Sequence, residues 1–199
     1  TYYLKFWPSL PEMPLIVPII ASIIIGIISG VITGLIISKL KVPAFLAGLG
    51  LQLIIYGGNL LFMKKAPNNS QPLAGFKESF TKFGTGSVAG VNYLIIVAFV
   101  VMIAVYIILN MTTLGKNIYA TGGNREAAKV AGINVFKIDM FVYILSGALA
   151  ALAGCMLAAR TGSANATYAE GYEMDAIASC IIGGVSFTGG IGNVPGAFL

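Results

Sequence analysis

The feature that most constrains this chain is a series of long apolar stretches that are almost free of charge. They lie at about 15–38, 42–63, 92–110 and 139–159, and the only charged residue in them is Asp139, at a boundary. A helix needs about 20 apolar residues to cross the roughly 30 Å hydrocarbon core of a bilayer. Each stretch is therefore predicted to form one transmembrane helix.

The composition excludes an ordinary soluble domain. Only 10% of the residues are charged, against about 25% in soluble domains. The net charge of +5 is compatible with a nucleic-acid partner, but the cations flank apolar stretches and do not form a stripe interleaved with aromatic residues. We therefore predict an all-α polytopic membrane protein, a helix bundle embedded in the lipid bilayer with no nucleic-acid partner.

A fifth apolar segment, at about 175–199, is interrupted by glycines at 183–184 and 189–192. Only about two helical turns precede the first pair, roughly 12 Å at 1.5 Å per residue, which is too short to span. Interrupted helices at membrane depth often mark the solute route in transporters, so we expect a discontinuous, Gly-rich C-terminal helix. The candidate path residues here are Glu173, Asp175, Gly183, Gly184 and Ser186. Alternatively, Glu173 or Asp175 only caps the short helix.

The chain is predicted to form a single transmembrane domain over residues 1–199. It opens at Thr1 and stops within an apolar segment, so we expect it to be truncated at both ends. Polar loops are predicted at 64–91, with a short helix at about 76–83, and at 112–138. The cations flanking the spans are equally divided between the two sides, so the positive-inside rule leaves the orientation open.

Two patterns within the predicted spans concern helix faces. Gly26, Gly30 and Gly34 recur every four residues and place small residues on one face, which favours close helix packing in lipid. Gln52, Tyr56 and Asn59 share another face. Amide and phenol groups of this kind bind hydroxyl-rich solutes, so these three residues are a candidate translocation surface. Hydrogen bonding between helices is the alternative.

The sequence offers no residues typical of a catalytic or metal site. It contains no His, and Cys155 and Cys180 lack a CxxC spacing. The Gly-rich run fits neither of the phosphate-binding motifs GxGxxG and GxxxxGK[ST]. We therefore expect no enzyme activity, no metal and no cofactor in this chain.

The loop at 112–138 contains a predicted two-turn helix. Asn124 is the expected N-cap and Gly132 the C-terminal cap, with Glu126 near the positive helix end and Lys129 near the negative one. The small residues Ala127 and Ala128 would let this helix press into a groove of a partner.

Four segments resemble one family of transporters. They are GKNIYATGGNREAAK at 115–129, ARTGSA at 159–164, GYEMDAIA at 171–178 and IGGVSFTGGIG at 182–192. In their order and spacing they resemble the permease subunits of bacterial ABC importers for monosaccharides, the family of ribose, xylose and galactose systems. The resemblance covers almost the whole chain.

The resemblance implies that the loop at 112–138 is cytoplasmic and docks into a cleft of an ATPase subunit. The coupling residues would be Gly122, Gly123, Asn124, Arg125, Glu126, Ala127, Ala128, Lys129 and Gly132. It also implies a multi-pass plasma-membrane location, a second permease copy and an extracytoplasmic sugar-binding protein. ATP and Mg²⁺ would bind to the ATPase subunits and not to this chain.

Within that family, the chain resembles the galactose and methyl-galactoside permeases. The similar segments lie at 11–13, 56–57, 72–76 and 180–187. Arg125 departs from this pattern, because the galactose group is expected to have Pro there. An ABC permease for ribose, a nucleoside, an autoinducer or a branched-chain amino acid is one alternative, and a passive or secondary transporter is another.

Overall fold

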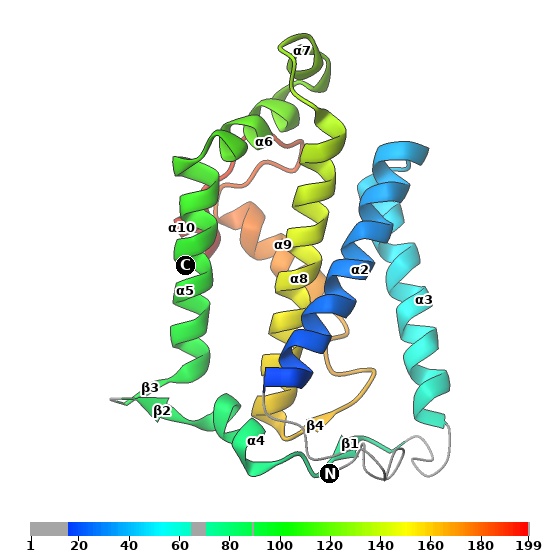
Figure 1. Ribbon diagram of the computed structural model, residues 1–199, viewed down its shortest axis with the longest axis vertical. Helices are drawn as coiled ribbons and strands as arrows, with labels where there is room; N and C mark the ends of the chain where they lie inside the picture. Colours follow the sequence, from blue (N-terminus) through cyan, green and yellow to red (C-terminus); the bar gives the residue numbers. More distant parts are fainter. Residues whose placement is uncertain (1–15, 65–70, 89, 199) are drawn as a thin grey trace. The chain divides into compact units, whose positions relative to one another are not determined.

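The computed structural model describes residues 16–64, 71–88 and 90–198 (Figure 1). The sequence segment 11–13, which contributes to the family resemblance, lies outside these residues. The helices are α2 (Ile16–Leu40), α3 (Ala44–Lys64), α4 (Glu78–Thr85), α5 (Tyr93–Met111), α6 (Thr113–Gly123), α7 (Arg125–Val130), α8 (Val135–Thr161), α9 (Tyr172–Ile182) and α10 (Val194–Phe198). Two-residue strands pair antiparallel, β1 (Leu73–Ala74) with β4 (Ser163–Ala164) and β2 (Ser87–Val88) with β3 (Val91–Asn92).

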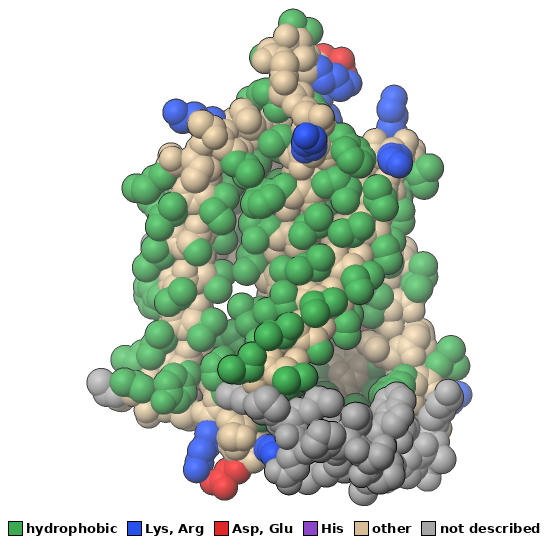
Figure 2. All heavy atoms as spheres, viewed as in Figure 1, with side chains coloured by type: hydrophobic (Ala, Val, Ile, Leu, Met, Phe, Trp, Pro, Cys, Tyr) green, Lys and Arg blue, Asp and Glu red, His purple; other side chains and the backbone are tan. Residues whose placement is uncertain are grey.

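Four of the described helices, α2, α3, α5 and α8, are long and apolar enough to cross a membrane. Their large apolar side chains point outward, as at Leu53 and Ile54, which are 70% and 71% exposed. Figure 2 shows hydrophobic side chains along the visible faces of these helices, with Lys and Arg near the helix ends. An apolar surface of this extent requires lipid or protein around it. The chain is an all-α polytopic membrane protein.

Helix α8 begins four residues before the predicted start at 139. The Asn134 side-chain oxygen accepts a hydrogen bond from the Lys137 amide at 3.1 Å, which caps the first turn. With 27 residues, α8 is about 40 Å long at 1.5 Å per residue. It therefore extends beyond a hydrocarbon core of about 30 Å, and polar residues in its first turns can lie at the membrane surface.

The chain divides into two compact units, and each is described by itself below. The first comprises the described part of residues 1–94 together with 143–168, and the second comprises 95–142 together with 169–198. Helices α5 and α8 contribute to both units.

In the first unit, α2 packs on α8 through glycines. A Cβ atom at Gly26 would lie 2.3 Å from the Gly147 carbonyl oxygen, and one at Gly30 would lie 2.4 Å from the Tyr143 carbonyl oxygen. Gly34 is buried as well. Since such distances are too short for any side chain, only glycine allows the two backbones this approach.

The polar stretch between α3 and α5 is attached to the C-terminal end of α8. A Cβ at Gly84 in α4 would lie 2.3 Å from the Arg160 backbone nitrogen, and the β1–β4 pairing joins Leu73 to Ala164. Helix α4 begins at Glu78, two residues later than predicted, because the Lys77 carbonyl accepts the first-turn hydrogen bonds. The Lys82 side chain hydrogen-bonds to Glu78 and lowers the pKa of that exposed carboxyl.

We expect Gly147→Ala to destabilise the protein by about 1–3 kcal/mol, the usual range for overpacking a close contact. Gly154→Ala, in the same helix, is the matched control, because a Cβ at Gly154 meets no atom within 4 Å. Alanine favours a helix over glycine by about 1 kcal/mol, so the control keeps or raises the Tm. Thermal unfolding in detergent micelles measures both variants. Equal Tm values would contradict the proposed packing role of Gly147.

Candidate functional site

Helix α6 follows α5 after a single residue, and the sequence analysis did not predict it. Thr112 is its N-cap, and its hydroxyl oxygen accepts a hydrogen bond from the Gly115 amide at 3.2 Å. A Cβ at Gly115 would lie 2.1 Å from the Leu109 carbonyl oxygen, so glycine permits the tight bend between the helices (Figure 1). The segment is too polar and too rich in glycine to be recognised as a helix by its apolar periodicity.

Helix α7 is held by a cap at each end. The Asn124 side-chain oxygen accepts hydrogen bonds from the Glu126 and Ala127 amides, both at 3.0 Å. At the other end, Gly132 has φ +82° and donates to the Lys129 carbonyl, while Ile133 donates to the Ala128 carbonyl. This pair of bonds is a Schellman motif. The capping residues expected from the sequence therefore define a helix of only six residues.

Apart from Ala128, every residue of α7 is exposed, including Glu126, Ala127 and Val130. The Glu126 side chain is 81% exposed and pairs with Lys129 at 2.7 Å, and Val130 is 91% exposed. Ala128, in contrast, is 3% exposed and packs within the chain. Ala127 and Val130 are therefore the apolar groups that α7 offers to a partner. Ala128, which the sequence pattern places on that surface, is buried instead, and Val130 carries no sequence signal that marks it.

Arg125 attaches α7 to the first turns of α8 by an ion pair with Asp139. Arg125 is the first residue of α7, a position where proline is favoured because its backbone N–H has no helical partner. The arginine thus stands where the resemblance leads us to expect Pro, without disturbing the helix, and its side chain adds a contact to α8.

The second candidate element is the interrupted segment that begins with α9. Gly171, with φ +91°, precedes the helix and donates its amide hydrogen to the Glu173 carboxylate at 3.1 Å, while Asp175 is exposed in the first turn. Helix α9 has 11 residues, about 16 Å at 1.5 Å per residue, which is roughly half of the hydrocarbon thickness.

Helix α9 ends in a second Schellman motif. Gly184, with φ +89°, donates to the Ile181 carbonyl at 3.0 Å, and Val185 donates to the Cys180 carbonyl at 2.9 Å. The chain then crosses a glycine loop at 183–193 before the short α10. A Cβ at Gly183 would lie 2.4 Å from the Gly196 carbonyl carbon, so the end of α9 touches α10 directly.

The glycine loop is internally hydrogen-bonded. The Ser186 amide donates to the Ile191 carbonyl at 3.0 Å, and the Ser186 hydroxyl lies 2.8 Å from the Thr188 hydroxyl. These bonds give the loop a defined shape outside any helix, as irregular backbone at membrane depth requires. Ser186, predicted as a path residue, here organises the loop.

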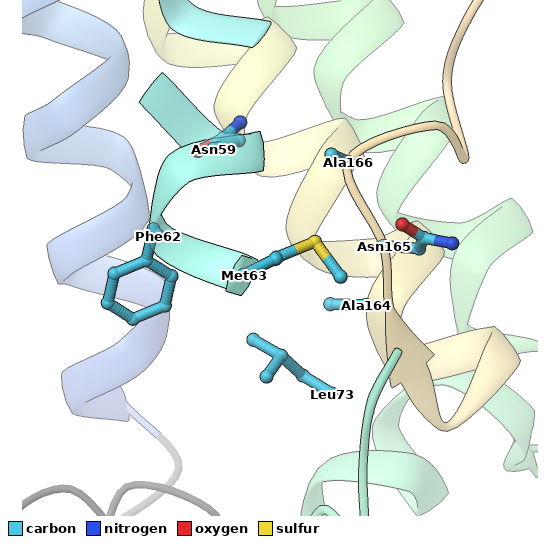
Figure 3. A pocket seen from close by; sticks show the side chains of 7 residues that line it. All are labelled: Asn59, Phe62, Met63, Leu73, Ala164, Asn165 and Ala166. Atoms are coloured by element: carbon cyan, nitrogen blue, oxygen red, sulfur yellow. The ribbon is translucent and has the colours of Figure 1, made fainter. Parts of the chain in front are cut away.

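In the first unit, the polar residues Gln52, Tyr56 and Asn59 all lie on α3. Asn59 lines a hollow of about 220 Å³ at the end of α3, whereas Gln52 and Tyr56 do not. The other lining residues are Phe62, Met63, Leu73, Ala164, Asn165 and Ala166. Figure 3 shows Met63 and Leu73 pointing toward one another near Ala164, with the Asn165 amide directed away from them. The hollow is therefore mainly apolar and poorly suited to a hydroxyl-rich solute.

Asn165 and its neighbours gave no functional signal in the sequence. They reach α3 because β1 and β4, about 90 positions apart in the chain, pair with each other. Among the described residues, no group of three or more His, Cys, Asp or Glu side chains could hold a metal ion.

Comparison with known proteins identifies relatives along the whole chain. A family profile described as branched-chain amino acid transport system / permease component matches residues 1–199. The galactose/methyl galactoside import permease protein MglC of Escherichia coli (strain K12) is 41% identical over 196 residues, which cover 96% of this chain and 58% of the relative. The corresponding protein of Haemophilus influenzae is 40% identical over the same share.

Ribose permeases are almost as similar. The ribose import permease protein RbsC of Escherichia coli (strain K12) is 40% identical over 167 residues, 82% of this chain and 51% of the relative. The chain thus spans little more than half the length of these curated relatives. No solved structure matches it.

We expect Asn124→Ala to loosen α7, because it removes the acceptor of two first-turn amides. An N-cap of this type contributes about 1 kcal/mol, which corresponds to roughly fivefold faster amide exchange. Hydrogen–deuterium exchange at Glu126 and Ala127 measures the effect, and Asn124→Asp is the control because a carboxylate also caps. Unchanged exchange in Asn124→Ala would show that packing alone holds α7.

Proposed function

From the premise that this chain belongs to the permease family described as branched-chain amino acid transport system / permease component, we propose that it is the membrane-spanning part of an ATP-driven sugar importer. The observation that supports this most strongly is the 41% identity with a galactose/methyl galactoside import permease over 96% of the chain. In this proposal the chain has no catalytic role and moves a monosaccharide across the bacterial plasma membrane.

We further propose that α7 docks into the ATPase subunit. Its exposed face combines one carboxylate, Glu126, with the small Ala127 and the apolar Val130. Two caps, the buried Ala128 and the Arg125–Asp139 ion pair hold it against the rest of the second unit. A short helix held in this way can transmit a push from its partner without being deformed first.

The docking proposal also fixes an orientation. With α7 in the cytoplasm, α5 runs inward and α8 outward, so α4, β1 and β4 face the outside. An extracytoplasmic sugar-binding protein would deliver its cargo on that side. A second permease copy and two ATPase subunits, which bind ATP and Mg²⁺, would complete the importer.

For the cargo, we propose galactose or methyl galactoside. The match with the galactose permease extends over 96% of the chain, against 82% for the ribose permease. The identities of 41% and 40% differ too little to decide, so ribose is the main alternative and is included in the test.

We expect ATP-dependent uptake of labelled galactose into proteoliposomes that hold the full-length permease and its ATPase, with the binding protein outside and ATP inside. Parallel vesicles receive labelled ribose, and a third set lacks ATP. Uptake of ribose alone would change the cargo and keep the mechanism. Uptake independent of ATP would indicate a facilitator and contradict the importer proposal.

We expect Glu126→Lys to abolish co-purification of the ATPase and ATP-driven uptake, because it reverses the charge on the docking face. Glu78→Lys is a closely matched control. Both carboxylates are 81% exposed and paired with a nearby lysine, so each reversal breaks a surface ion pair, and such pairs add little to stability. The control should retain the ATPase. Equal retention by both variants would remove α7 from the ATPase interface.

A further inference from the structure

Two glycine pairs that are remote in sequence meet backbone to backbone in the second unit. A Cβ at Gly122 would lie 2.6 Å from the Gly190 nitrogen, and one at Gly190 would lie 2.6 Å from the Gly123 Cα. The Tyr119 hydroxyl also donates to the Gly192 carbonyl at 3.3 Å. The end of α6 thus lies directly on the glycine loop that follows α9.

We propose that this contact transmits the movement of α7 to the interrupted segment α9–α10. The inference rests on the proposed function, since it takes α7 as the helix that the ATPase moves. Where side chains separate two elements, their rotamers can absorb a small shift. At Gly122 and Gly190 no side chain intervenes, so a displacement of α6 must push the loop or break the contact. A contiguous series of packed groups can carry coupling of this kind.

The packed groups that connect α7 to the glycine contact begin at Asn124, between α7 and α6. Asn124 is at once the last cap of α6 and the first cap of α7. Its backbone amide donates to the Ala120 carbonyl, and its side chain accepts from the first turn of α7. A displacement of α7 that carries Asn124 with it therefore moves the end of α6 that carries Gly122 and Gly123.

Beyond the glycine contact, hydrogen bonds and close packing connect the glycine loop to α9 and α10. The hydrogen bond from Ser186 to Ile191 closes the loop into one piece, so a push at Gly190 reaches Gly184 and the end of α9. There the close approach of Gly183 and Gly196 joins α9 to α10. The moved element would be the interrupted helix, the type of segment that lines solute paths in transporters.

A buried hydroxyl lies beside the contact, on the residue before Gly122. Thr121 is 5% exposed, and its side-chain oxygen has no hydrogen-bond partner among the described residues. A buried unpaired hydroxyl is unfavourable. A second position of α6 in which Thr121 finds an acceptor would recover that loss, which is the property expected of an element with two states.

The test measures sugar uptake per ATP hydrolysed in proteoliposomes containing the full-length permease, its ATPase and the binding protein. Gly122→Ala and Gly190→Ala should each lower this ratio about fivefold or more, within the usual range of coupling between sites. ATP hydrolysis and assembly with the ATPase should persist in Gly190→Ala, because Gly190 lies outside the loop at 112–138 that contains α7. A general folding defect would lower uptake and hydrolysis together.

Each variant has a matched control in the same chain. Gly90→Ala, in the turn between β2 and β3, imposes the same kind of backbone strain as Gly190→Ala, with φ +83° against +77°, but its Cβ meets nothing within 4 Å. Gly154→Ala places a methyl group in a helix, as Gly122→Ala does, and also meets nothing. Both controls should keep the wild-type ratio. A wild-type ratio in Gly122→Ala and Gly190→Ala, or an equal loss in the controls, would overturn the inference.

If Gly122→Ala or Gly190→Ala fails to assemble with the ATPase, the Tyr119→Phe variant tests the inference instead. It removes the hydrogen bond to Gly192 without adding an atom, so a lowered ratio supports the inference and an unchanged ratio overturns it. Failure of the proposed function is recognised separately, because the wild-type protein itself would then show no ATP-dependent uptake. That result would overturn both proposals.

Discussion

The structure depends on one constraint, that every backbone N–H and C=O group within lipid needs a hydrogen-bond partner in the protein. Four long described helices meet this constraint along their whole length. Helix α9 meets it differently, because a Schellman motif at Gly184 and the bonds of Ser186 satisfy the backbone where the helix stops. The break after α9 is therefore stabilised by specific hydrogen bonds. It leaves a short helix, a shaped loop and α10 in the place of one continuous span.

Glycine has a second use here, as the residue that lets two backbones touch. In the first unit, Gly26 and Gly30 bring α2 onto α8, and in the second, Gly122 meets Gly190. Packing of this kind replaces the hydrophobic driving force that is absent between helices in lipid. The first contact joins two long helices over several turns, whereas the second joins a helix end to a loop.

Helix α7 combines small size with firm attachment. Six residues are too few to form a stable helix alone, so Asn124, the Gly132 motif, the buried Ala128 and the Arg125–Asp139 pair are all needed to hold it. What remains exposed is a compact face suited to a protein groove. In the proposed importer, this arrangement separates the docking surface from the residues that attach it to the membrane part.

The sequence by itself determined the membrane class, the long spans, the caps of α7 and the family, because these depend on local composition, on spacing within one helix or on residue order. It could not determine that α6 is a helix, that Ala128 faces inward while Val130 faces outward, or that Asn165 lies close to the end of α3. It also could not show that Gly122 meets Gly190, since the two glycines belong to separate motifs that lie far apart in the chain. These features depend on which distant segments pack together in three dimensions. The space left between two backbones then decides whether only glycine fits at the contact.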